Sequence, residues 1–228
     1  MKTAGGSTAA KRRAGKRAAQ EVEDGMVVGL GTGSTTAHAI RAIGEAVSEG
    51  LEVRGIPTSY QSRTLAIEVG IPLTTLEEAD GVDLAIDGAD QVADGDLIKG
   101  GGAAHAREKF VDAAADRFLV VADPSKLVDT LERSVPVEVL PAARSVVEER
   151  VGDLEGEPEL RAAERKDGPV VTDNGNLVLD CDFGEIDEPA VLARDLASIP
   201  GVVEHGLFVD MADVTYVGTD DGVDIHRH

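Results

Sequence analysis

The sequence predicts an α/β fold in which a mostly parallel sheet is joined by a smaller α+β unit. In the first half, short apolar runs typical of strands alternate with helical patterns, as in a parallel sheet. From Val135 the predicted order becomes strand, helix, strand, strand, helix, strand, which is the ferredoxin-like arrangement. With 228 residues, 42% of them hydrophobic, the chain can form a core in both parts.

Four strands are predicted in the first half, at 26–30, 51–56, 82–86 and 118–122. A Gly-rich turn and helix follow the first strand, a helix ending at Gly70 follows the second, and a helix at 103–115 precedes the fourth. Ligands of open α/β sheets bind at the carboxyl ends of the strands, where this sequence carries polar, Gly-rich or Lys-containing loops. We therefore expect the functional site there.

The second half is predicted to form a separate unit before the chain returns to the first sheet. The expected elements are a strand at 135–140, a helix opened by Pro141, a strand within 158–164, a hairpin at 169–181 turning at Asn174-Gly175, a helix from Pro189 to about Ile199 and a strand at 201–208. Two short strands in 212–225 are expected to rejoin the first sheet. The predicted domains are 1–131 with 206–228, and 132–205, packed across a cleft.

Composition restricts the possible functions. A net charge of −21 and 3% aromatic residues argue against binding nucleic acid or an anionic membrane surface. The 43 acidic residues predict a protein that stays soluble in concentrated salt, so a single carboxylate is weak evidence of a site. The one cysteine, Cys181, and the absence of a signal-peptide pattern or a bilayer-length apolar run predict a cytoplasmic protein.

The segment Gly29 to Ile40, GLGTGSTTAHAI, follows the first predicted strand. Its glycines permit a sharp turn, after which Ser34 and its neighbours would present amides and hydroxyls at a helix N-terminus. A phosphate cradle and an ordinary capped turn both remain possible. A dinucleotide fingerprint lacks its third glycine, since position 36 is Thr, and the P-loop Gly-Lys pair is absent. A small phosphorylated ligand is the better hypothesis.

The segment Ile86 to Lys109 carries several charged residues that could do chemistry. Asp87 and Asp90 stand at a predicted strand end, whereas Asp94 and Asp96 have the spacing of an exposed turn, and no EF-hand pattern is present. Lys99 precedes three glycines, which suggests close approach of the backbone to a ligand.

On the next predicted helix, Glu108 could be a base with a raised pKa, or it could pair at the surface with Arg107 or Lys109. The sequence does not choose between these two possibilities. His38 and His105 are interpreted as structural, and His226 and His228 as part of a mobile tail, so no metal site is predicted.

Six segments in order, GTGSTTAH, DGAD, IKGGGAAHAREK, ADPSK, PVEVLPAAR and VVTDNGN, closely resemble the A-type ribose-5-phosphate isomerase family over nearly the whole chain. The resemblance implies interconversion of D-ribose 5-phosphate and D-ribulose 5-phosphate without a metal or organic cofactor. It also implies a Rossmann-like domain with a ferredoxin-like one, and a homodimer or homotetramer.

The resemblance also implies roles for individual residues. The substrate-binding positions are Thr32, Gly33, Ser34 and Thr35, the sugar-contacting segment Asp87, Gly88, Ala89 and Asp90, and the segment Lys99, Gly100, Gly101 and Gly102. Glu108 falls on the catalytic base, and Lys126 and Lys11 fall on phosphate contacts. The first sixteen residues depart most from the family pattern.

The expected reaction is proton transfer through an enediol intermediate. Asp87 or Asp90 would assist ring opening, Glu108 would move the proton, and Lys99 would stabilise the developing oxyanion. Two other classes remain as alternatives: a non-catalytic sugar-phosphate sensor domain, which would need a DNA-binding segment, and a nicotinamide-dependent dehydrogenase, which would need the missing glycine.

Overall fold

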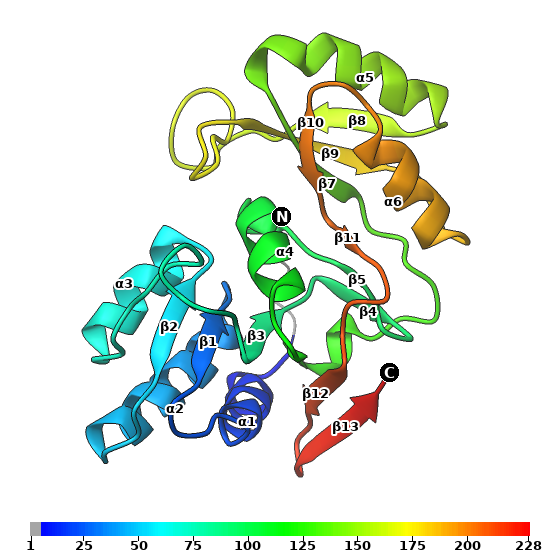
Figure 1. The fold of residues 1–228 in the computed structure, drawn as a ribbon. Coiled ribbons are helices and arrows are strands. Elements are labelled where there is room, and N and C mark those ends of the chain that lie inside the picture. Colours follow the sequence, from blue (N-terminus) through cyan, green and yellow to red (C-terminus); the bar gives the residue numbers. More distant parts are fainter. Residues whose placement is uncertain (1–5) are drawn as a thin grey trace.

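The computed structural model describes residues 6–228, and within that range the strands form three sheets. Figure 1 shows a large sheet with α1, α2 and α3 beside it, and a second sheet with α5 and α6 at the opposite end of the molecule. Helix α4 contacts strands of both sheets. A parallel sheet accompanied by separate antiparallel sheets confirms the predicted fold class.

The large sheet has the order β13-β12-β6-β3-β1-β2, and all its pairs are parallel except β12 with β13. Its strands are β1 (Val27–Leu30), β2 (Arg54–Pro57), β3 (Leu84–Gly88), β6 (Phe118–Ala122), β12 (Val214–Gly218) and β13 (Val223–Arg227). The predicted return of the chain end to this sheet is confirmed. His226 lies in β13 and His228 contacts the Thr215 hydroxyl, so the prediction of a mobile tail was wrong.

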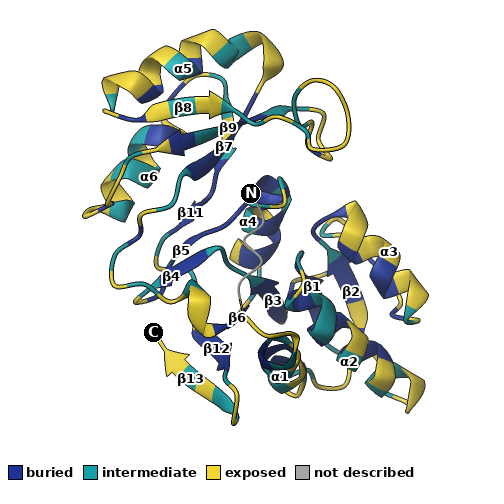
Figure 2. Ribbon diagram, turned by 180° about the vertical axis from the view of Figure 1, so that it is seen from behind, coloured by how far each residue is buried: buried dark blue, intermediate teal, exposed yellow. Residues whose placement is uncertain are grey.

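Residues that alternate along each strand pack on opposite faces of the large sheet. Leu119 and Val121 of β6 pack with α1 (Thr8–Ala19), α2 (Thr36–Ser48) and α3 (Tyr60–Glu68). Phe118 and Val120 face the other way, toward the three-stranded sheet. Helix α4 (His105–Ala113) covers this second face through Val111. Figure 2 shows β12 buried and its edge neighbour β13 largely exposed.

The sequence did not predict the three-stranded antiparallel sheet. It contains β4 (Gln91–Ala93), β5 (Asp96–Ile98) and β11 (Leu207–Phe208). Asp94 and Gly95 form the tight turn between β4 and β5, both with positive φ, and Asp96 begins β5. This hairpin turns the chain back, so that Lys99 follows directly after β5 and returns to the large sheet.

The third sheet has the order β10-β7-β9-β8 with every pair antiparallel, as expected for the ferredoxin-like unit. Its elements are β7 (Val135–Val139), α5 (Arg144–Asp153), β8 (Glu157–Leu160), β9 (Leu177–Asp182), α6 (Pro189–Ala197) and β10 (Val202–His205), with a single 3₁₀ turn at η2 (Pro141–Ala143). A second 3₁₀ turn, η1 (Pro124–Lys126), directly follows β6 of the large sheet. Its core consists of Val, Leu and Ile with Cys181. The exact domain limits, 1–131 with 206–228 and 132–205, stay a prediction.

Two predicted strands of the second half differ in the structure. The first arm of the hairpin at 169–181 forms only isolated bridges, because the loop 172–176 bonds to a side chain instead: Glu138 Oε1 accepts bonds from the side chains of Thr172, Asn174 and Asn176. The predicted strand 201–208 breaks at Gly206, whose N–H donates to the Pro136 carbonyl and whose carbonyl accepts from Lys99. The chain therefore changes sheets at that glycine.

The core position of β6 predicts a large cost for truncating Leu119, which is fully buried. Leu119→Ala should lower the free energy of unfolding by about 2 to 5 kcal/mol, because it removes apolar contacts and leaves a cavity. The matched control, Leu140→Ala, alters a side chain that is 50% exposed and should cost about 1 kcal/mol or less. Urea unfolding at one fixed salt concentration measures both; equal costs would contradict this description of the core.

Candidate active site

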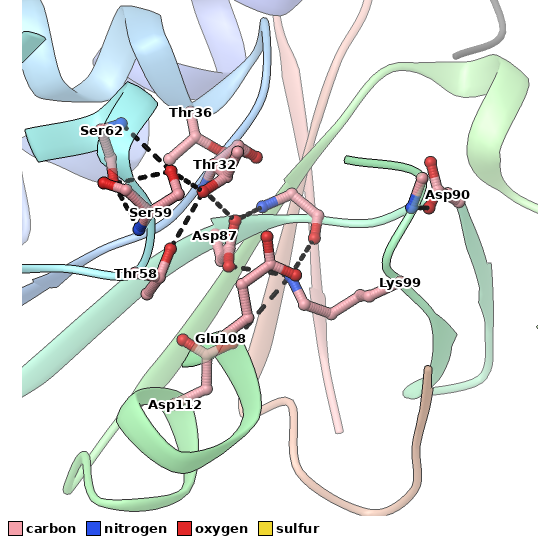
Figure 3. Close-up of polar contacts among 12 residues, drawn as sticks. Thr32, Thr36, Thr58, Ser59, Ser62, Asp87, Asp90, Lys99, Glu108 and Asp112 are labelled. Atoms are coloured by element: carbon pink, nitrogen blue, oxygen red, sulfur yellow. Dashed lines mark hydrogen bonds and ion pairs between the residues drawn. The ribbon is translucent and has the colours of Figure 1, made fainter. Parts of the chain in front are cut away.

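The candidate site lies at the carboxyl end of β3, where a fully buried lysine meets three carboxyl groups. The Lys99 ammonium is 2.9 Å from Asp87, 3.4 Å from Glu108 and 3.9 Å from Asp112, and it donates to the Gly88 carbonyl at 2.6 Å. All four charged side chains are at most 6% exposed. Figure 3 shows them converging from β3, the segment after β5, and α4.

Asp87 connects this cluster to the Gly-rich turn after β1. Its Oδ1 accepts the backbone N–H groups of Thr32 at 2.9 Å and of Gly88 at 2.7 Å, while Oδ2 faces Lys99. The close packing explains a glycine in this turn, because a Cβ at Gly31 would lie 2.0 Å from the Asp87 carboxyl carbon. Asp87 is therefore enclosed by the protein.

The turn after β1 is held by hydroxyl groups of the loop that precedes α3. The Thr32 hydroxyl donates to Ser59 at 2.7 Å and lies 3.0 Å from the Thr58 hydroxyl. Ser59 in turn caps α3 through a reciprocal pair of bonds with Ser62. Two strand ends are thereby fixed to each other beside the cluster.

A cavity of about 180 Å³ opens onto these groups. Every candidate residue from the sequence lines it except Asp87: Lys11, Thr32, Gly33, Ser34, Thr35, Gly88, Ala89, Asp90, Lys99, Gly100, Gly101, Gly102, Glu108 and Lys126. Lys11 reaches the cavity from α1, a helix that the sequence did not predict, and Lys126 reaches it from η1 after β6. The structure thus brings together segments that are far apart in the chain.

Sequence reasoning missed two polar residues of the site. Asp112 is the third carboxyl near Lys99, and its spacing of four residues from Glu108 on one helix face was a usable signal. Gln61 lines the cavity from the first turn of α3, where nothing in the sequence distinguished it. His105 is buried and structural in position, with Nε2 3.3 Å from the Glu204 carbonyl.

Burial and neighbouring charges change the proton affinity of the cluster. Burial, reinforced by the negative charge of Asp87 and opposed by Lys99, raises the pKa of Glu108 to about 8. Burial also raises the pKa of Asp112 well above its usual range. For Lys99, burial lowers the pKa, but the carboxylates of Asp87, Glu108 and Asp112 outweigh it, so the pKa is raised and the ammonium stays charged.

These properties suit a proton transfer next to a developing oxyanion. A carboxyl group with a pKa near neutrality can both take and return a proton, and Lys99 supplies a permanent positive charge beside it. Among residues 6–228, no group of three or more His, Cys, Asp or Glu side chains is arranged to hold a metal ion. In the same range, no helix has the length and apolar character needed to cross a membrane.

Comparison with known proteins gives the family. The model of the family described as ribose 5-phosphate isomerase A (phosphoriboisomerase A) matches residues 54–222. Ribose-5-phosphate isomerase A of Natronomonas pharaonis is 73% identical over 225 residues, which cover 99% of this chain and all of that protein. The corresponding protein of Haloarcula marismortui is 69% identical over 221 residues, covering 97% of this chain and 96% of its own.

Solved structures agree with the sequence relatives. Ribose 5-phosphate isomerase A from Methanocaldococcus jannaschii superposes with a TM-score of 0.93 at 46% identity, covering 96% of this chain and 98% of that one. A D-ribose-5-phosphate isomerase in complex with phospho-erythronic acid gives a TM-score of 0.93 at 45% identity, with the same coverage. The chain therefore belongs to the ribose 5-phosphate isomerase A family of aldose-ketose isomerases.

Proposed function

We propose that this protein interconverts D-ribose 5-phosphate and D-ribulose 5-phosphate through an enediol intermediate, with Glu108 as the base. One observation carries the proposal: a single cavity combines Lys11, Lys126 and the Ser34 turn, which suit a phosphate, with Lys99 and Glu108, which suit proton transfer. The ligand of the structural relative, phospho-erythronic acid, has a phosphate and a carboxylate, and a carboxylate resembles the planar oxygens of an enediolate. This combination favours catalysis over a sensor domain.

Ring opening is assigned to Asp90. The substrate is a cyclic sugar whose C1 hydroxyl must lose its proton while the ring oxygen gains one. Asp90 lines the cavity and is held by the Gly101 N–H at 2.7 Å, whereas Asp87 is fully buried and does not line it. We therefore infer that Asp87 positions Lys99 and Thr32, and that Asp90 acts on the sugar.

The isomerisation then moves one proton between neighbouring carbons. The Glu108 carboxylate takes the C2 proton of the open-chain aldose, the electron pair forms the C1–C2 double bond, and negative charge develops on the C1 oxygen. Lys99 stands 3.4 Å from Glu108 and stabilises that charge, an effect worth about 3 to 4 kcal/mol for a well-placed donor. Glu108 then returns the proton to C1, while the proton of the C2 hydroxyl passes to the C1 oxygen, so that C1 becomes an alcohol and C2 the ketone.

We further infer a cytoplasmic location and a homodimer or homotetramer. The first inference rests on Cys181, the one cysteine of the chain, which is free and buried. The second rests on the resemblance to the family. Both go beyond the geometry of the site.

Replacing Glu108 by Gln should lower kcat by about 10²-fold to 10⁴-fold with little change in KM, because the amide cannot accept the C2 proton. Glu45→Gln is the control, since Glu45 is an exposed partner of Lys16 and should leave turnover unchanged. An assay of ribulose 5-phosphate formation measures both variants. Near-normal turnover of Glu108→Gln would remove Glu108 from the role of base.

The pH dependence follows from the raised pKa of Glu108. Only the carboxylate can take the C2 proton, so kcat/KM for ribose 5-phosphate should rise with pH and level off above about pH 8. The phosphate of the substrate also titrates, with a second pKa of about 6. Its effect on the pH profile can therefore be distinguished from that of Glu108, whose pKa is about 8. If kcat/KM does not change between about pH 6 and about pH 9, Glu108 is not the titrating base, because its transition near pH 8 falls inside that range.

Removing the ammonium of Lys126 should weaken substrate binding more than turnover. Lys126→Ala is expected to raise KM by about tenfold or more, the value of a charge-assisted hydrogen bond to phosphate, with a smaller effect on kcat. Lys16→Ala is the matched control, because Lys16 is exposed on α1 and does not line the cavity. Steady-state kinetics at one fixed salt concentration tests this, and an unchanged KM would argue against phosphate contact.

A further inference from the structure

One peptide unit of the site, between Gly100 and Gly101, is held at both ends by charged side chains. The Gly100 carbonyl accepts a hydrogen bond from Arg161 Nη1 at 2.9 Å, and the Gly101 N–H donates to Asp90 Oδ2 at 2.7 Å. In a trans peptide the C=O and N–H point in opposite directions, so these two bonds together fix the orientation of its plane. Gly100 has φ +103°, a conformation that residues with a side chain rarely adopt, and because glycine is the most flexible residue such a restraint on its peptide is useful.

Arg161 directly follows β8, an edge strand of the four-stranded sheet, and its guanidinium is itself held by a carboxylate. Arg161 Nε donates a hydrogen bond to Asp180 Oδ2 of β9 at 2.8 Å, and Nη2 donates one to Oδ1 of the same carboxylate. The Arg161 side chain is only 11% exposed. A bidentate pair with a carboxylate has a fixed planar geometry, so Nη1 is aimed at the Gly100 carbonyl.

The surroundings of the peptide leave it little room to rotate. A Cβ at Gly100 would come within 2.7 Å of His105 Nδ1, so the glycine packs directly on that ring. Burial lowers the pKa of His105 to about 3, so the imidazole is neutral. Asp90, on the far side of the peptide, lines the cavity, whereas Arg161 does not.

We propose that Arg161 is a positioning residue of the isomerase, which orients the Gly100–Gly101 peptide and through it the Asp90 carboxylate. The four-stranded sheet, through Arg161 and Asp180, thereby contributes to catalysis without touching the substrate. This proposal rests on the proposed function, in which Asp90 acts on the sugar. Arg161 and Asp90 are linked through the Gly100–Gly101 peptide, so substituting either residue should disturb the same step, the opening of the sugar ring.

A double-mutant cycle tests whether Arg161 acts through Asp90. Arg161→Met keeps the length of the apolar stem and removes all donors, and should lower kcat/KM for ribose 5-phosphate by about tenfold to a hundredfold, as expected for a small misplacement of a reacting group. In an Asp90→Asn background the same substitution should lower kcat/KM by about twofold or less, because the group it positions is already lost. A merely structural role would give equal factors in both backgrounds.

Two further variants control for folding. Arg144→Met removes an arginine of α5 that pairs with Glu148 and does not reach the site, and should leave kcat/KM unchanged. Asp180→Asn keeps Arg161 but removes one acceptor of its bidentate pair, and replaces Arg161→Met in the cycle if that variant does not fold. Thermal unfolding of each variant shows whether it is folded at the assay temperature.

The outcomes separate the two proposals. Absence of isomerase activity in the unmodified protein would contradict the proposed function. An active protein in which Arg161→Met leaves kcat/KM within about twofold, or in which its effect is the same with and without the Asp90 carboxylate, would overturn the positioning role alone.

Discussion

The site depends on holding the Lys99 ammonium almost completely buried at the edge of the cavity. Removing a charge from solvent costs several kcal/mol, and the structure offsets this cost with the Gly88 carbonyl and the carboxyl groups of Asp87, Glu108 and Asp112. Burial raises the pKa of Glu108 and Asp112, the negative charge of Asp87 adds to this effect, and the single positive charge of Lys99 does not offset it. This is what makes a glutamate a usable base near neutral pH.

The same lysine explains why the chain passes between the sheets where it does. The hairpin of β4 and β5 brings Lys99 to the end of β3. The backbone N–H of Lys99 donates to the Gly206 carbonyl, at the point where the chain passes from the four-stranded sheet to the three-stranded one. A Cβ at Gly206 would come within 2.2 Å of the Lys99 carbonyl oxygen, so only glycine permits this approach. The loop 172–176 adds a second connection, since Arg107, beside the base, donates to Asn174.

Electrostatics at long range and at short range act in opposite directions on the substrate. With a net charge of −21 the protein repels a phosphate at a distance, although concentrated salt screens that field strongly. The cavity compensates locally with Lys11 and Lys126 from segments more than a hundred residues apart. The acidic composition agrees with relatives from haloarchaea, and it concerns solubility more than chemistry.

The sequence by itself determined the alternation of strands and helices, the two kinds of sheet and most of the cavity residues, because these follow from local periodicity and from motifs at strand ends. It did not predict the three-stranded sheet or the breaking of the strand at Gly206, since both depend on backbone partners far away in the chain. Residue patterns alone left Glu108 undecided between base and surface pair, and only the family resemblance pointed to the base; Asp112 was missed, because proton affinity depends on burial and on which charges meet. Only the tertiary structure decided that Asp87 is enclosed while Asp90 faces the cavity, since two carboxylates three residues apart look equivalent until neighbouring strands and loops surround one of them.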